Sequence, residues 1–270
     1  MKIAAIQMVS GTDLQRNLDA AGTLLVQAAA QGAELAVLPE YFCLMGAQDT
    51  DKLAIQESMG HGQIQDFLSQ AARDLGLWIV GGTLPITSTE VQRVRNSSLV
   101  FGPSGQCVAR YDKIHLFQFD NGVESYDEGR VLQAGTDAVS FELASVDGNT
   151  YRIGLSICYD LRFAELYREL AADVLLVPSA FTFTTGQAHW EVLLRARAIE
   201  NLAYVLAAAQ GGVHDNHRRT WGHTMVVDPW GQVLVQHDTG SAVILAEVSK
   251  DDLQTARARL PALHHRVRVA

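Results

Sequence analysis

Hydrophobic positions along this chain change repeatedly between two patterns: short apolar runs of strand length, and longer segments in which apolar residues recur every three or four positions. The predicted strands of the first half are residues 3–8, 35–38 and 77–81. The predicted helices of this half lie between Asp13, which can cap a helix, and Gly32, which can end one, and over residues 63–75. Alternation of this kind predicts a sheet that is covered by helices.

The second half of the chain repeats the alternation. Its predicted strands are residues 174–177 and 204–208, and its predicted helices are residues 163–170 and 189–201. The chain has 270 residues and is 48% apolar, which is enough to bury a large core. We therefore expect an α/β fold in which residues 1–270 form one domain.

Short segments of the two halves also resemble each other. Residues 38–42, LPEYF, resemble residues 177–181, VPSAF, and this alignment puts Ser179 where the first half has Glu40. A second resembling pair is formed by the predicted hairpins at residues 99–108 and 226–234. Because Pro and Gly are ordinary turn residues, chance stays open as the alternative to a repeat.

Charge and cysteine content restrict the partners and the compartment. A formal net charge of −9 argues against a nucleic-acid-binding or anionic-membrane surface, so a small molecule is the expected partner. Cys43, Cys107 and Cys158 lack the paired spacing of a zinc site or a redox motif, so we expect no disulfide, no metal and a cytoplasmic location. The first eight residues are too short an apolar stretch for a signal peptide, and no run is long enough to span a bilayer.

Cys158 stands at the end of an apolar run, residues 152–157, and directly before a turn into a helix. This position is expected to expose the sulfur partly and to bring helix N-terminal N–H groups near it, which favours the thiolate. Glu40 ends the second predicted strand, and Lys113 follows a further predicted strand at residues 107–111. A nucleophile, a base and a cation are the groups that amide hydrolysis through a thiol requires.

In this interpretation Glu40 takes the proton of the thiol, passes it to the leaving nitrogen and then activates the water that hydrolyses the thioester. Lys113 stabilises the oxyanion, with the backbone N–H of Tyr159 as a second donor. The ordinary alternatives are a buried structural thiol for Cys158, a salt bridge for Glu40 and a solvated cation for Lys113. The chain has only four lysines against seventeen arginines, so a lysine inside an apolar stretch favours a function.

Three segments carry a resemblance to a known family: Leu38–Glu40, Asp112–Phe117 and Gly154–Phe163. Together and in this order they resemble the motifs of the carbon-nitrogen hydrolase (nitrilase) superfamily. The resemblance covers essentially the whole chain and implies an αββα sandwich, no metal or organic cofactor, and a homo-oligomer. Candidate contacts of that oligomer are Tyr167, Leu170 and Ala171.

Within the superfamily, residues 183–191 and 221–231 resemble the Nit branch, and residues 207–212 and 225–228 resemble its amidases of deaminated glutathione. This resemblance implies hydrolysis of a small amide bearing a 2-oxo acid, with 2-oxoglutarate and cysteinylglycine as products, in metabolite repair. Two alternatives stay open: an omega-amidase acting on 2-oxoglutaramate or 2-oxosuccinamate, and a non-catalytic Nit-like binding module.

A second glutamate is implied by the resemblance alone. Glu128 matches a superfamily residue that orients the lysine and assists in handling the proton. The connecting loop is shorter by about one residue than in many Nit relatives, so Asp127 and Glu124 stay open as alternatives to Glu128.

The acyl side of the substrate is expected near Arg162, which follows Cys158 in the first turn of the predicted helix. A guanidinium there can hold a carboxylate, although an ion pair with Glu165 or Glu169 is an equally ordinary use of it. The Nit resemblance adds Phe181 and Thr185 to the same pocket, and Tyr159 is expected to bind the substrate as well. The leaving-group side is expected at two loops, residues 118–125 and 211–221.

Other interpretations of the chemistry are weaker. The segment Gly154-x-Ser156-x-Cys158 lacks the final glycine of a G-x-S-x-G elbow, so Ser156 is not expected to be a nucleophile. A papain-like Cys–His pair is compatible with the nine histidines of the chain, but no histidine is placed as the three motifs are. Four histidines lack a metal-ligand framework and are expected in an exposed loop and tail: His214, His217, His264 and His265.

Overall fold

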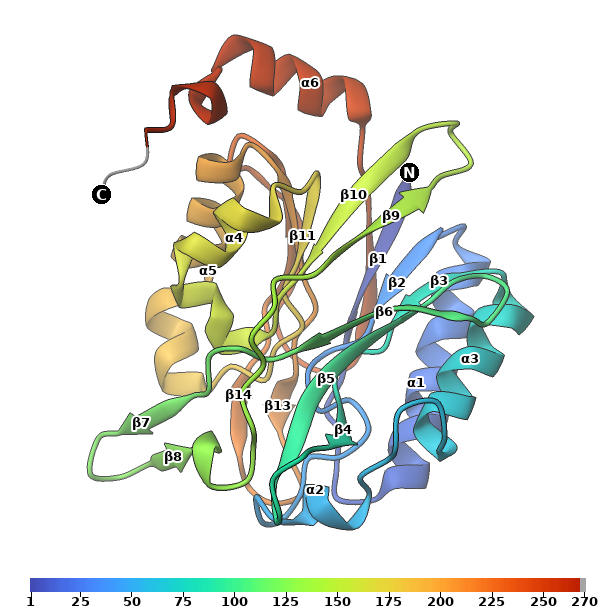
Figure 1. Cartoon of the computed structure of the whole chain (residues 1–270), viewed down its shortest axis with the longest axis vertical. Coiled ribbons are helices and arrows are strands. Elements are labelled where there is room, and N and C mark those ends of the chain that lie inside the picture. Colours follow the sequence, from blue (N-terminus) through green and yellow to red (C-terminus); the bar gives the residue numbers. More distant parts are fainter. Residues whose placement is uncertain (268–270) are drawn as a thin grey trace.

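The computed structural model describes residues 1–267, in which two β-sheets stack face to face between two layers of helices (Figure 1). The strand order of the first sheet is β17-β1-β2-β3-β5-β4, and β6 also pairs with β5. Its strands are β1 (Lys2–Gln7), β2 (Leu35–Val37), β3 (Trp78–Val80), β4 (Leu84–Thr87), β5 (Val94–Phe101), β6 (Cys107–Asp112) and β17 (Ala242–Glu247). Strands β1, β2 and β3 run parallel, so their carboxyl ends meet at one edge.

The second sheet has the order β16-β15-β12-β11-β10-β9, and β10, β11 and β12 run parallel. Its strands are β9 (Ser140–Ala144), β10 (Thr150–Leu155), β11 (Val174–Leu176), β12 (Tyr204–Ala207), β15 (Thr224–Val227) and β16 (Val233–His237). Two small hairpins are formed by β7 (Gln118–Asp120) with β8 (Ser125–Asp127) and by β13 (Gly211–Val213) with β14 (Arg219–Trp221). Both hairpins lie at the end of the sandwich where the parallel strands finish (Figure 1).

Helices cover the outer face of each sheet (Figure 1). Those on the first sheet are α1 (Leu14–Ala30) and α3 (Gln63–Leu75), and those on the second are α4 (Ala164–Leu170) and α5 (Phe183–Asn201). The remaining helices are α2 (Asp51–Ala54), α6 (Lys250–Arg259) and the 3₁₀ turns η1 (Glu128–Arg130), η2 (Cys158–Arg162) and η3 (Ala262–His265). The predicted α/β class and αββα sandwich are confirmed.

The parallel strands β2, β11 and β12 are apolar along their whole length because both of their faces are buried. In β1, Ile3 and Ala5 join the core between the two sheets, whereas Ala4 and Ile6 join the core beneath α1 and α3. A strand with one wet face would alternate apolar and polar residues, so the continuous runs in the sequence identify buried strands.

The two halves share one topology, as the predicted repeat requires. The order β1-β2-β3-β5-β6 of the first half matches the order β10-β11-β12-β15-β16 of the second, and the flanking antiparallel strand is β17 in one case and β9 in the other. Both terminal hairpins carry a register shift at the matching place, between Val100 and Phe101 and between Val226 and Val227. A chance resemblance of turn residues would not produce these common features, and the repeat is confirmed.

Helix α5 begins at Phe183, earlier than the predicted start at His189. Thr182 is its N-cap, and the Thr182 hydroxyl accepts a hydrogen bond from the backbone N–H of Thr185 at 3.4 Å. The first turns of this helix are mostly polar, so hydrophobic spacing does not reveal them.

Two of the three expected oligomer contacts are wrong. Tyr167 and Leu170 are buried in the core, and the Tyr167 hydroxyl lies 2.8 Å from the Ser156 hydroxyl. Their helical spacing on α4 turns them toward β10 and not toward solvent, and only Ala171 is exposed.

Candidate active site

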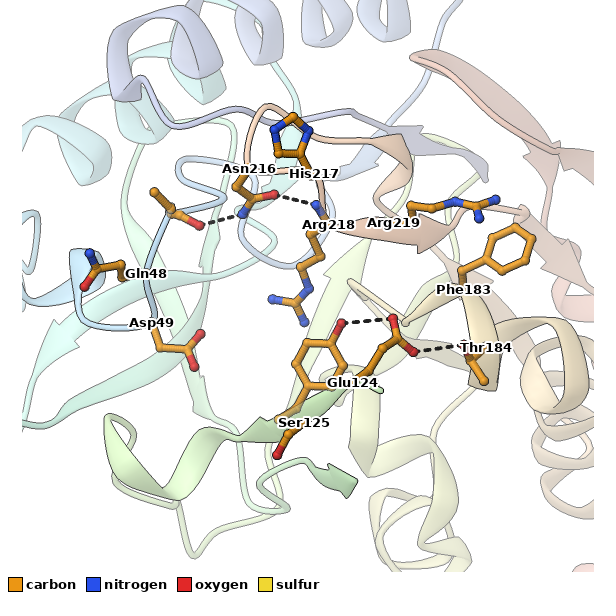
Figure 2. Close-up of a pocket in the computed structure, with 13 residues that line it drawn as sticks. Gln48, Asp49, Glu124, Ser125, Phe183, Thr184, Asn216, His217, Arg218 and Arg219 are labelled. Carbon is orange, nitrogen blue, oxygen red and sulfur yellow. Dashed lines mark hydrogen bonds between the residues drawn. The ribbon is translucent and has the colours of Figure 1, made fainter. Parts of the chain in front are cut away.

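The carboxyl ends of the parallel strands meet at one end of the sandwich, and the predicted reactive residues lie there. Glu40 comes shortly after β2, Lys113 follows β6 directly, and Cys158 comes shortly after β10. Two cavities open at this end. The larger one, of about 530 Å³, is lined by four separate segments and is mostly polar (Figure 2). The smaller one contains Cys158.

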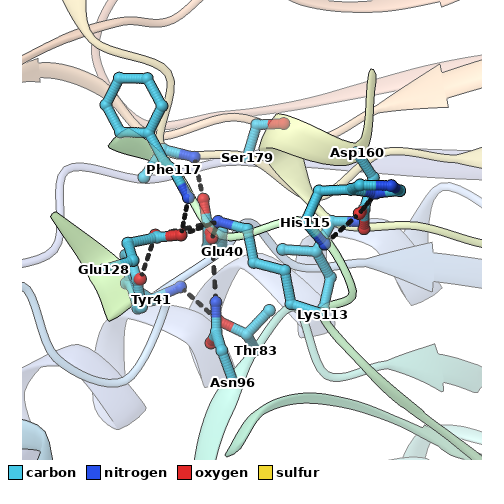
Figure 3. A network of polar contacts seen from close by, with 12 residues as sticks. Glu40, Tyr41, Thr83, Asn96, Lys113, His115, Phe117, Glu128, Asp160 and Ser179 are labelled. Atoms are coloured by element: carbon cyan, nitrogen blue, oxygen red, sulfur yellow. Dashed lines mark hydrogen bonds and ion pairs between the residues drawn. The ribbon is translucent and has the colours of Figure 1, made fainter. Parts of the chain in front are cut away.

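Lys113 is the centre of a buried ionic cluster (Figure 3). Its ammonium donates to Glu40 Oε1 at 2.9 Å and lies 2.8 Å from Glu128 Oε2, while its side chain is fully buried. One cation between two carboxylates leaves the group with a net negative charge. The ammonium of Lys113 is buried and ion-paired, so the ordinary alternative of a solvated cation is wrong.

The Glu40 carboxylate is held from several sides. Besides Lys113, the Asn96 side-chain amide donates to Oε1 at 3.0 Å and the backbone N–H of Ala180 donates to Oε2 at 2.8 Å. The residue that follows, Tyr41, has a positive φ of 57°, and its N–H donates to the Thr83 hydroxyl at 2.9 Å. A strained bend thereby turns Glu40 inward from the strand end.

The structure brings Glu128, and neither of its two alternatives, to Lys113. Glu128 also accepts hydrogen bonds from the Tyr41 hydroxyl at 2.8 Å and the Phe117 N–H at 2.7 Å. Asp127 instead caps η1 by accepting from the N–H of Gly129, and Glu124 accepts from a threonine hydroxyl in the large cavity.

Asp160 holds the turn that carries Cys158. Its carboxylate is fully buried and accepts from the Ile157 N–H at 2.9 Å and from the Tyr111 hydroxyl at 2.7 Å. His115 adds its backbone N–H at 3.0 Å and its ring nitrogen Nδ1 at 2.7 Å (Figure 3). Cys158 itself has a positive φ of 50°, a conformation that persists only where the surroundings fix it.

Burial and ion pairing act in opposite directions on the pKa values of the cluster. Burial by itself lowers the pKa of Lys113, but the carboxylates of Glu128 and Glu40 outweigh it and hold that pKa above its usual range. Burial raises the pKa of Glu128, and the Lys113 ammonium outweighs this effect, so the pKa is lowered. The ammonium and the Glu128 carboxylate therefore stay charged across the physiological range.

Cys158 is a buried thiol and not the partly exposed thiolate that its position in the sequence suggests. Burial raises the pKa of Cys158 well above its usual value, the Glu40 carboxylate raises it further, and Lys113 opposes them. The residue is only 7% exposed. Since η2 is a short 3₁₀ helix of five residues with a small dipole, burial and the nearby carboxylates outweigh that dipole at the sulfur.

The small cavity gathers the predicted pocket residues around the thiol. Tyr159, Phe181 and Thr185 line it together with Cys158. Arg162 lies beside it, with its guanidinium 5.6 Å from the Tyr159 ring centroid and 5.5 Å from that of Phe181. Both terminal nitrogens of this guanidinium lie 3.3 Å from His189 Nδ1, and within residues 1–267 it has no carboxylate within 4.0 Å. The alternative of an ion pair on α4 is therefore wrong, and the charge of the guanidinium can pair with an anion.

Several residues of this region have no prediction from the sequence: Asn96, Thr83, Tyr111, His115 and Asp160. His214 was expected to be exposed, but it is buried, with Nδ1 2.8 Å from the Ser10 carbonyl and Nε2 2.8 Å from the Thr220 hydroxyl. The expectation is wrong because one of its two partners, Ser10, comes from a distant segment of the chain. The other three histidines of that group are exposed, and the described part of the chain has no cluster of three or more potential metal ligands. For Asp160, a useful signal is a carboxylate two positions after the nucleophile in the same motif.

Comparison with known proteins agrees with this geometry. A family model described as carbon-nitrogen hydrolase matches residues 2–258. The deaminated glutathione amidase of Synechocystis sp. is 42% identical, with 98% of this chain and 97% of that protein covered. The deaminated glutathione amidase of Homo sapiens is 38% identical, with 98% and 81% covered.

Solved structures show the same relationship. XC1258 from Xanthomonas campestris, a CN-hydrolase superfamily protein with an arsenic adduct in its active site, superposes with a TM-score of 0.86 at 30% identity over 100% of this chain and 98% of that one. The C. elegans NitFhit protein gives 0.85 at 36% identity over 98% and 64%. Sequence motifs, site geometry and both comparisons therefore agree that this chain belongs to the carbon-nitrogen hydrolase family.

Proposed function

We propose that this chain is a thiol amidase that hydrolyses deaminated glutathione to 2-oxoglutarate and cysteinylglycine. The observation that carries the proposal is the buried Glu40–Lys113–Glu128 cluster beside Cys158. Relatives 38% and 42% identical along nearly the whole chain bear the name deaminated glutathione amidase, which supports the same substrate here. An intact reactive cluster also favours an enzyme over a non-catalytic binding module.

In the first half-reaction the sulfur of Cys158 attacks the amide carbonyl carbon. Because the pKa of the thiol is raised, the proton must leave as the new S–C bond forms, and Glu40 is the base in position to take it. Lys113 and the backbone N–H of Tyr159 stabilise the oxyanion. The C–N bond then breaks, and Glu40 returns the proton to the leaving nitrogen.

In the second half-reaction a water molecule hydrolyses the thioester. Glu40, again a carboxylate, takes a proton from the water, the new C–O bond forms and the sulfur leaves as Cys158 regains its proton. Glu128 holds the Lys113 ammonium in position through both steps, since it shares that cation with Glu40. Arg162, between Tyr159 and Phe181, binds the carboxylate of the 2-oxo acid.

Kinetics with two substrates tests the assignment. Deaminated glutathione and 2-oxoglutaramate share the acyl end and differ in the leaving group, so the comparison of kcat/KM isolates that difference. We expect a clear preference for deaminated glutathione. A preference for 2-oxoglutaramate would make the chain an omega-amidase, and hydrolysis of neither would overturn the substrate assignment.

We also propose that residues 1–270 form one domain, which works in metabolite repair in the cytoplasm as a homo-oligomer. Across residues 1–267 no helix has the length and apolar character to cross a membrane. Light scattering at micromolar concentration tests the oligomer: a particle of the 29.4 kDa chain mass would contradict it.

A further inference from the structure

The large cavity beside the thiol contains two arginines without an acidic partner (Figure 2). The Arg218 guanidinium projects into it over the ring of Tyr126, 4.8 Å from the ring centroid, and its Nε is buried without a hydrogen-bond partner. Arg219 lies 4.1 Å above the Phe183 ring centroid. In the part of the chain that the structure describes, neither guanidinium has a carboxylate within 4.0 Å. Both cations are therefore free to bind an anion.

The two carboxylates of the same cavity are already engaged. Glu124 accepts from the Thr184 hydroxyl at 2.9 Å and lies 3.4 Å from the Tyr126 hydroxyl. Asp49 lies 3.8 Å from the Lys52 ammonium. Both carboxylates thus have a partner in the protein, whereas the guanidiniums of Arg218 and Arg219 have unused donors that fit a ligand with a carboxylate.

The loop that carries Arg218 is fixed before any ligand binds. The His214 ring bridges the Ser10 carbonyl and the Thr220 hydroxyl at 2.8 Å each. Asn216 accepts from the Arg218 N–H at 2.9 Å and donates to the Gly46 carbonyl at 2.6 Å. A guanidinium on a pre-ordered loop loses little conformational entropy on binding.

The large cavity and the thiol cavity share the first turn of α5. Phe183 and Thr184 line the large cavity, and their neighbours Thr182 and Thr185 line the thiol cavity. Adjacent residues are only about 3.8 Å apart along the backbone, and an extended dipeptide spans about 7 Å. The two cavities thus adjoin at this turn, and a dipeptide that begins at the scissile nitrogen beside Cys158 has the large cavity as its neighbouring space.

We propose that Arg218, assisted by Arg219, binds the terminal carboxylate of the cysteinylglycine leaving group. The proposal of this subsite rests on the proposed function, and it names the residue that makes the enzyme prefer deaminated glutathione to 2-oxoglutaramate. The planar guanidinium can meet the carboxylate through two parallel hydrogen bonds while it remains stacked on Tyr126. The product of 2-oxoglutaramate hydrolysis is ammonia, which has no group for this subsite, so Arg218 favours the larger substrate.

The test combines one substitution with one change in the substrate. Wild type and Arg218→Gln are assayed with deaminated glutathione, with its C-terminal carboxamide and with 2-oxoglutaramate. In the wild type we expect kcat/KM to fall about 10- to 100-fold when the carboxylate becomes a carboxamide, because a charge-assisted pair is lost. In Arg218→Gln the two forms should differ by less than about threefold, since the partner of the carboxylate is gone.

The controls separate binding from structure. Arg93→Gln removes an arginine that pairs with Glu90 away from the cavity, and it should keep the full preference for the carboxylate. Arg218→Lys should be intermediate, because it keeps the charge and loses the planar fork. A preference that persists in Arg218→Gln, or an equal loss with all three substrates, would overturn the subsite while the proposed function stands. Failure of the wild type to hydrolyse deaminated glutathione would overturn both.

Discussion

The two halves of the sandwich place different residues at matching positions. Strand pairing matches Cys158 with Met8, Glu40 with Ser179 and Lys113 with Thr239. None of the counterparts carries a charge or exchanges a proton near neutral pH. The repeated topology therefore provides two sets of strand ends, and the side chains at only one set can perform chemistry.

The neutral half still contributes to the reactive one. The bend after β11 presents the N–H of Ala180 to Glu40 at 2.8 Å, next to Ser179. Both bends begin alike, since Leu38 donates to the Val80 carbonyl at 3.0 Å and Val177 donates to the Leu206 carbonyl at 2.9 Å. The comparison shows that a strand end without a charged side chain can still hold the reactive group of its counterpart in place.

The largest difference in kcat between matching positions of the two halves is expected for Cys158 and its counterpart Met8. We expect Cys158→Ala to lose kcat by about 10⁴-fold or more, because no other nucleophile is in place. Its counterpart Met8→Leu is a volume-conserving change in the core and should keep kcat within about threefold. Steady-state amidase assays check both, with circular dichroism to confirm the fold. Comparable activity of the two variants would contradict the role of Cys158.

The second pair is Glu40→Gln against Ser179→Ala. Loss of the base should lower kcat by roughly 10²- to 10⁴-fold, while the apparent Michaelis constant changes little. The Ser179 hydroxyl donates to the Val177 carbonyl at 3.2 Å, so its removal should lower the stability by about 1 kcal/mol and change the rate little. A Glu40→Gln variant that changes only the Michaelis constant would assign Glu40 to binding.

The third pair is Lys113→Met against Thr239→Val. We expect about a 10²- to 10³-fold loss of kcat from Lys113→Met because an oxyanion donor disappears. The change also leaves Glu40 and Glu128 unpaired, which destabilises the fold by about 3–5 kcal/mol, so assays belong well below the midpoint of unfolding. Thr239→Val should change neither kcat nor the free energy of unfolding appreciably.

Stability measurements sharpen the comparison at the two matching hairpins. Gly105 and Gly231 have φ values of +81° and +84°, so alanine at either should cost about 1–2 kcal/mol from strain alone. A Cβ at residue 105 would lie 2.8 Å from the Ser69 carbonyl oxygen, which is backbone, whereas one at residue 231 would meet the movable Ile199 side chain at 2.6 Å. Urea unfolding should therefore show Gly105→Ala as the less stable variant, and the reverse order would contradict this.

The smallest expected effect is on the pH dependence of stability and arises from His214, a buried residue of the second half. Burial lowers the pKa of His214 below its usual value, so the unfolded chain binds the proton more readily than the folded one. Stability from this group is present above the unfolded pKa of about 6.5 and is lost as pH falls toward the lowered value. His214→Gln should flatten that part of the curve in urea titrations, and an unchanged slope would contradict the account.

The fold could be predicted from the sequence further than the site could. Strands buried on both faces, such as β2 and β11, are continuous apolar runs. The motifs that follow β2 and β10 locate Glu40 and Cys158. The start of α5 could not be predicted because its first turns are polar, and hydrophobic spacing does not reveal a polar turn. The state of the Cys158 proton depends on burial and on the Glu40 carboxylate, which is more than a hundred residues away in the chain, and a local helix-turn pattern contains neither. His214 shows the same limit, since its partner Ser10 is 204 residues away in the chain.

The proton on Cys158 also determines how the resting protein meets oxidants. Peroxide attacks thiolates far faster than thiols, and exposure of the sulfur decides how often the two meet. A buried sulfur kept protonated by its surroundings is a poor target on both counts. The sulfur becomes nucleophilic only when a substrate carbonyl lies beside it and Glu40 takes the proton. Glu40 therefore contributes both to the resistance of the resting sulfur to oxidation and to its reactivity during turnover.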